Sequence, residues 1–324
     1  MSLPLVQASI GGRPRRALLQ RPSALLVAHR HLLDERMKRA AAGESESGGN
    51  KRRSVADSGS DAEITPQHLI DTQLESLLVT ASKAPSRSRA KASLKAIRSL
   101  LAAVAAHDAT PADCPDALVR DPAVVLSWHP PVAVELCGSF AQCTTVSSAA
   151  VPGHAPGVDV AVQMPRACFL AKDYLNHKYS DKRALYLSVI LRALRDSTMF
   201  ASAQLDRATS ARPIITVRAS AETPHLRIIP HVGEEGLARA KLLPSRNNNR
   251  TGGATAASLP TPRYNNQVLA DILMLHVEKD MQAAIASNPT LTKAMALAKI
   301  WLMQRHLHRS PGGMSPCQLC PILC

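Results

Sequence analysis

A short turn of glycine and serine stands where an apolar run ends, and an aspartate follows on the next apolar run. The run Val132–Leu136 leads directly into Gly138-Ser139, and Asp159 lies within the valine-rich segment 158–162. A Gly-Ser turn brings backbone N–H and hydroxyl groups close to a phosphate chain. Carboxylates at alternate strand positions face one side and can share a pair of divalent ions. The pattern is therefore typical of metal-dependent nucleotidyl transfer.

The carboxylates that this chemistry needs are incomplete. Nucleotidyltransferases of the polymerase-β type place a second carboxylate two residues after the first and a third on a later strand. Here position 161 is Ala161, and the expected strands at 213–219 and 225–232 contain no Asp or Glu. One carboxylate does not hold two Mg²⁺ ions against their hydration. We therefore expect a degenerate nucleotide pocket of Gly138, Ser139 and Asp159, with no catalytic residue, no metal and no cofactor.

Three alternatives remain open at this stage. An active RNA nucleotidyltransferase would require Glu222 or Glu234, from the flanking turns, to supply the missing ligand. A generic basic RNA-binding module would need no pocket at all. The Cys317-x-x-Cys320 pair, with Cys324, resembles half of a zinc site, but no second pair of cysteines or histidines follows it.

The charge of the chain favours a polyanionic partner. Its 324 residues include 39 Lys and Arg against 25 Asp and Glu, a net charge of +14. The stretch 76–107 contains no acid, and basic residues at 89, 91, 95 and 98 form one edge of an expected helix. On the later helix, Lys178, Lys182 and Arg183 are the residues that we expect to contact RNA phosphates. Aromatic residues are only 3% of the chain, which argues against base stacking as the mode of binding.

Apolar periodicity predicts the elements that position these residues. Five strands are expected at 123–126, 132–136, 158–162, 213–217 and 226–232, with a long helix at 172–196. Further helices are expected at 264–286 and 291–307. No apolar run is long enough to span a membrane. The fold class is therefore α/β (α+β), with helices before and after the sheet.

Composition divides the expected fold into consecutive parts. Residues 1–64 should be disordered, because their second half is rich in Ser, Gly and charge. The parts that follow are a helical hairpin at 65–110, an α/β domain at 120–250, helices at 263–310 and an irregular tail at 311–324.

Several motifs, in order, resemble the Nrap family of nucleolar RNA-associated proteins. They are VDVAVQMP at 158–165, KDYLN at 172–176, KRALYL at 182–187, LLPSRNN at 242–248, PRYN at 262–265 and ALAKIWL at 296–302. The resemblance implies a nucleotidyltransferase-like domain followed by a helical domain like that of poly(A) polymerases. It also implies that the pocket is catalytically dead. Because family members are several times longer, we expect the helical domain to be truncated here.

The resemblance also implies a function and a location. Members act as non-catalytic scaffolds of the small-subunit processome, in nucleolar pre-rRNA processing and small-subunit biogenesis. The implied partners are pre-rRNA, small nucleolar ribonucleoprotein and other processome proteins. Neither a membrane nor a small-molecule substrate is expected, and the implied location is the nucleolus.

Overall fold

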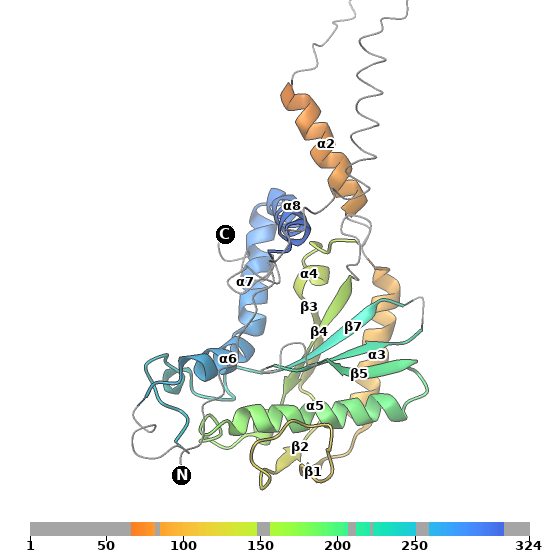
Figure 1. Ribbon diagram of the computed structural model, residues 1–324. Coiled ribbons are helices and arrows are strands. Elements are labelled where there is room, and N and C mark those ends of the chain that lie inside the picture. Colours follow the sequence, from red (N-terminus) through yellow and green to blue (C-terminus); the bar gives the residue numbers. More distant parts are fainter. Residues whose placement is uncertain are drawn as a thin grey trace, which may run out of the picture. The chain divides into compact units, whose positions relative to one another are not determined.

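The computed structural model describes residues 66–81, 85–147, 156–206, 212–220, 223–250 and 259–307 (Figure 1). The chain divides into two units between residues 63 and 64, and the fold below belongs to the second, 64–324. The disorder expected at 1–64, the tail at 311–324 and its cysteines lie outside the described residues. No described helix has the length and apolar character needed to cross a membrane.

A five-stranded mixed sheet forms the centre of the second unit. Its order is β3-β4-β7-β6-β5, and only the β4–β7 pair is parallel. The strands are β3 (Ala133–Cys137), β4 (Gly157–Met164), β5 (Ser202–Asp206), β6 (Ile214–Arg218) and β7 (His225–Val232). This confirms the α/β class. The edge strand β5 was not predicted, because its sequence SAQLD is too polar to give a strand signal.

The expected strand at 123–126 is displaced toward the C-terminus. β2 (Leu126–Trp128) instead pairs with β1 (His107–Ala109) in a separate two-stranded sheet. Trp128 is fully buried, and its ring lies 4.3 Å from that of Tyr186. This contact fixes the small sheet against the long helix α5 (Lys178–Asp196).

The core lies between the sheet and two helices, α5 and α3 (Arg87–Ala103). Val158, Val160 and Val162 of β4 are fully buried on this side, because alternate residues of a strand face the same way. α5 begins six residues later than expected. Asn176 and His177 have φ values of 55° and 63°, and two left-handed residues interrupt a right-handed helix.

The helix α2 (Pro66–Ala81) does not form the expected hairpin with α3. α2 packs mainly against α8 (Thr290–Gln304), whereas α3 packs against α5 and β3. The apolar side of α2 is accordingly only partly covered, and Leu69, Ile70 and Leu74 are exposed. The two helices therefore belong to different layers of the unit.

Three helices follow the sheet, and the segment expected as one helix at 264–286 is two. They are α6 (Pro262–Ile272), α7 (Met274–Ser287) and α8, with the first break at Leu273. Pro262 stands at the first position of α6, where its missing N–H is not needed. The short helices α4 (Gly138–Ala141), η1 (Arg166–Cys168) and η2 (Arg239–Lys241) complete the described elements.

Candidate functional site

Gly138 and Asp159 meet at the end of β3, as the sequence predicted. Gly138 has a φ of 66°, and a Cβ at this position would lie 2.7 Å from Oδ2 of Asp159. Both the backbone conformation and this close approach therefore require glycine. The neighbouring Cys137 is directly across from Asp159 in the antiparallel register, which brings the turn onto the carboxylate.

The carboxylate of Asp159 is held by a guanidinium from the adjacent strand. Arg227 lies across from it on β7, in the parallel register. Its Nε donates to Oδ1 at 2.6 Å and its Nη2 donates to Oδ2 at 2.9 Å, which is a bidentate pair. Burial raises the pKa of Asp159, and the charge of Arg227 opposes that rise. Both oxygens that would bind a metal ion are thus engaged by an arginine.

The backbone N–H of the Gly-Ser turn is also occupied, by a carboxylate from α7. Gly138 N–H donates to Oε2 of Glu278 at 3.0 Å, and the side-chain amide of Gln142 donates to the same oxygen at 3.0 Å. Gln282, one turn further along α7, donates to Oε1 at 3.1 Å. An acidic side chain therefore stands where such a turn would receive a phosphate.

Ser139, the second residue of the turn, is bound by a lysine from α8. Nζ of Lys299 donates to Oγ of Ser139 at 2.9 Å and to the hydroxyl of Thr144 at 2.6 Å. Lys299 is only 5% exposed, so these neutral oxygens replace its hydration. The turn is therefore fixed from both sides by the C-terminal helices.

Four charged side chains, two of each sign, meet around the Gly-Ser turn. Asp159 and Glu278 carry the negative charges, and Arg227 and Lys299 carry the positive ones. Ala161, at the position of the missing carboxylate, is 1% exposed and so lies inside the protein. Among the described residues, no group of three His, Cys, Asp or Glu could hold a metal ion.

Of the two acids considered as replacement ligands, the structure describes Glu234. Glu234 is exposed and pairs with Arg239 at 3.3 Å, and its carboxylate lies 3.8 Å from the ring of His276. Glu222 lies outside the described residues.

Replacing Arg227 with methionine tests the pairing within the pocket. The carboxylate of Asp159 then lacks its partner, and we expect the free energy of unfolding to fall by about 2 kcal/mol at pH 7. Without the guanidinium, the pKa of Asp159 rises further above its unfolded value. A raised carboxyl pKa means that the folded state binds the extra proton, so stability returns as the pH falls through that pKa. Urea unfolding at several pH values measures both effects.

The matched control is Arg239→Met, which breaks the exposed pair with Glu234. This variant should lose less than about 1 kcal/mol of unfolding free energy, because exposed pairs contribute little. Lowering the pH should not restore its stability. Equal losses in the two variants would contradict the pairing described for Asp159.

Two of the three residues expected to contact RNA are buried instead, which corrects that prediction. Lys182 pairs with Asp173 at 2.8 Å and donates to the carbonyl of Cys168. Arg183 pairs with Asp271 at 3.0 Å and donates to the carbonyl of Pro213 at 2.8 Å. Buried charges are kept in place by such partners, so these two stabilise the fold. Lys178, at the start of α5, is exposed.

The asparagines of the LLPSRNN and PRYN motifs bind each other inside the protein. Asn248 donates to Oδ1 of Asn265 at 2.9 Å, and Asn265 donates to the carbonyls of Leu243 and Arg246 at 2.8 and 2.9 Å. Asn265 is fully buried and Asn248 is 2% exposed. The motifs therefore join the end of the α/β domain to α6.

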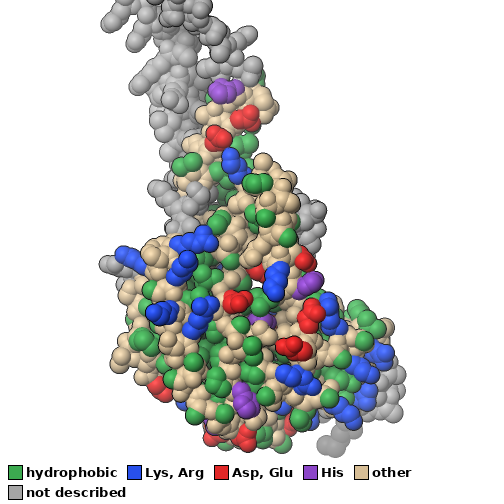
Figure 2. Space-filling view, turned by 180° about the vertical axis from the view of Figure 1, so that it is seen from behind, with side chains coloured by type: hydrophobic (Ala, Val, Ile, Leu, Met, Phe, Trp, Pro, Cys, Tyr) green, Lys and Arg blue, Asp and Glu red, His purple; other side chains and the backbone are tan. Residues whose placement is uncertain are grey.

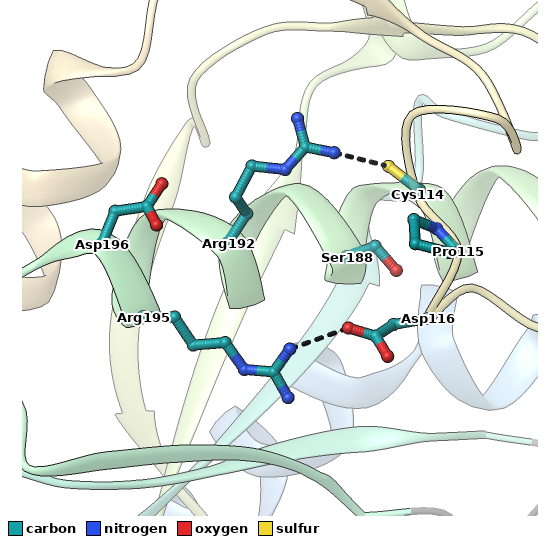
Figure 3. A pocket seen from close by; sticks show the side chains of 7 residues that line it. All are labelled: Cys114, Pro115, Asp116, Ser188, Arg192, Arg195 and Asp196. Carbon is teal, nitrogen blue, oxygen red and sulfur yellow. Dashed lines mark hydrogen bonds and ion pairs between the residues drawn. The ribbon is translucent and has the colours of Figure 1, made fainter.

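A small cavity of about 170 Å³ lies between α5 and the segment 114–116 (Figure 3). Arg195 points toward Asp116, 2.8 Å away, and Arg192 points toward Cys114. Burial raises the pKa of the Cys114 thiol, which keeps it protonated and unreactive. The contacts across this cavity hold the segment onto the helix.

Sequence reasoning missed Arg227, Glu278 and Lys299. Lys299 carried a usable signal, because it is the one charge in the otherwise apolar stretch 294–303. A single charge in such a stretch indicates a buried polar partner. Glu278 lies 140 residues from Gly138, and no local pattern marks it.

The comparisons with known proteins define the family. The family model described as "Nrap protein domain 1" matches residues 94–287, and the chain belongs to this family. The match covers the sheet, α5, α6 and α7, and it therefore includes Gly138, Asp159, Arg227 and Glu278.

Curated relatives carry the name "Nucleolar protein 6". The Xenopus laevis protein is 33% identical over 201 residues, which are 57% of this chain and 17% of that protein. The Homo sapiens protein is 30% identical over 199 residues, again 57% and 17%. The chain thus spans about a sixth of the length of these relatives. These relatives confirm the nucleolar location that the family resemblance implied for this chain.

Among solved structures, the one titled "structure of GLD-2/RNP-8 complex" aligns with 51% of this chain and 40% of its own. The identity is 11% and the TM-score is 0.31. A likeness of this size does not define the fold family.

Proposed function

We propose that the chain is a non-catalytic, nucleotidyltransferase-like part of the small-subunit processome, acting in nucleolar pre-rRNA processing. The observation that carries the proposal is the closed pocket. Glu278 accepts a hydrogen bond from the N–H of the Gly-Ser turn, and Arg227 donates hydrogen bonds to both carboxylate oxygens of Asp159. Because the chain's own side chains engage these groups, the proposal assigns the nucleotidyltransferase-like frame a structural role.

The sheet and turn support the nucleotidyltransferase-like assignment. The Gly-Ser turn follows β3, the aspartate stands on the adjacent β4, and the long α5 packs against β5, β6 and β7 of the same sheet. On this proposal, α6–α8 are the start of the helical domain found behind the catalytic domain of poly(A) polymerases. Its contribution here is to close the pocket with Glu278 and Lys299.

The proposed partners are pre-rRNA, small nucleolar ribonucleoprotein and other processome proteins. Support comes from membership of the Nrap family and from the basic net charge of +14. Positive charge favours association with an RNA-rich particle through its phosphates.

Depletion and rescue in cells test the proposal. A tagged chain should sediment with pre-ribosomal particles, and its depletion should cause pre-rRNA precursors to accumulate. A rescue copy with Asp159→Asn and Arg227→Met, which removes both charges of the pair, should restore processing fully. The proposal fails if the chain sediments only as free protein and its depletion leaves processing intact. A folded rescue copy that does not restore processing would contradict the non-catalytic role.

A further inference from the structure

One face of α3 is a continuous row of basic side chains. Arg87, Lys91, Lys95 and Arg98 follow one another at spacings of four, four and three residues, which places them on the same side of a helix. All four are exposed, whereas the opposite side of α3 is buried in the core. In Figure 2, blue side chains gather on the left of the view, over this helix.

This row is electrostatically unfavourable for the isolated protein. Like charges four residues apart repel one another along a helix. Arg87 and Arg89 also lie in the first turn of α3, which contains no acid. The positive end of the helix dipole is there, so cations at these positions destabilise the helix further.

No carboxylate of the described residues pairs with Arg87, Lys91, Lys95 or Arg98. Lys91 and Lys95 make no ion pair with any described residue. Arg98 donates to the carbonyl of Val134 at 2.7 Å, and Arg87 lies 3.8 Å from the sulfur of Cys143. Neither acceptor is a carboxylate.

Three cations described above differ in this respect. Lys182, Arg183 and Arg227 are each paired with a carboxylate. The repulsion within the row on α3 therefore lowers the stability of the protein, and the fold does not require these charges.

We infer that this face of α3 binds the phosphate backbone of RNA. The inference rests on the proposed function, which supplies RNA as the polyanion. α3 rises about 6 Å every four residues, so the four cations form a line that can follow one strand of phosphates. The sequence of α3 contains no aromatic residue to stack on bases. Binding is therefore to the backbone of structured RNA, without base readout.

The test uses Lys91→Gln with Lys95→Gln in the full chain, and an RNA hairpin of about 20 base pairs as the probe. Two lost phosphate contacts should reduce the slope of log K against log salt by about 1 to 2. Affinity near 0.1 M salt should fall about tenfold or more. The melting temperature of the variant should stay the same or rise, because repulsion along α3 is relieved.

Two further variants make the result specific. Lys279→Gln with Lys293→Gln removes the same charge from exposed positions on α7 and α8, and it should leave the salt slope unchanged. Lys91→Arg with Lys95→Arg keeps the charge and should keep the affinity.

Three results would overturn the inference. They are no RNA binding by the unmodified chain, an unchanged slope in the α3 variant, or an equal fall in both glutamine variants. If the α3 variant keeps its RNA binding but no longer binds a poly-glutamate probe, the partner of this face is an acidic protein. Sedimentation with pre-ribosomal particles is measured separately, so the proposed function can stand if this face fails.

Discussion

Replacing Asp271 with alanine is expected to lower the free energy of unfolding by about 3–5 kcal/mol. Asp271 is 1% exposed and lies on α6. It pairs with Arg183 at 3.0 Å and with Arg212. It also accepts a hydrogen bond from the hydroxyl of Tyr179 at 2.9 Å. Its removal leaves the buried guanidinium of Arg183 without its counter-charge, which is the most expensive kind of loss in a protein interior.

Urea unfolding measures this loss, and Asp280→Ala is the matched control. Asp280 lies on the next helix, and its side chain is 70% exposed. The control should change the unfolding free energy by no more than about 0.5 kcal/mol. A loss below about 1 kcal/mol in Asp271→Ala would mean that the buried cluster does not connect α5 to α6 as described.

Replacing Asn265 with alanine should have the second largest effect, about 3 kcal/mol. The substitution removes a long hydrogen bond from the Thr261 hydroxyl, at 3.4 Å, and three shorter ones that are each worth roughly 1 kcal/mol. They join the Asn265 side chain to Asn248 and to the carbonyls of Leu243 and Arg246. Because the site is fully buried, water does not replace these partners.

The neighbouring residue supplies a matched control for this substitution. Asn266→Ala changes the same side chain one position further along α6, where it is exposed. Calorimetry should show a clearly lower melting temperature for the Asn265 variant and little change for the Asn266 variant. Similar behaviour of the two would show that the LLPSRNN and PRYN motifs are not joined through Asn265.

Local patterns predicted the elements whose partners are close in sequence. The alternation of Val158, Val160 and Val162 identified β4, and the absence of an acid at Ala161 was visible directly. The exposed basic edge of α3 also followed from its periodicity. β5 was missed because an edge strand buries little and needs few apolar residues.

The prediction of Lys182 and Arg183 as surface residues was wrong because charge alone does not report burial. The partner of Arg183 is Asp271, which is distant in sequence and marked by no motif. The meeting of Gly138 with Asp159 was predictable from the strand layout. The residues that close the pocket were not, since Lys299 binds a serine 160 residues away.

The most direct test of the closed pocket is nucleotide binding and transfer by the full chain with Mg²⁺. Isothermal titration with ATP or UTP should show no saturable binding at millimolar concentration, and an RNA primer should not be extended. Glu278 at the turn and Arg227 on Asp159 are the reasons for this expectation. Mg²⁺-dependent primer extension that Asp159→Ala abolishes would contradict the account.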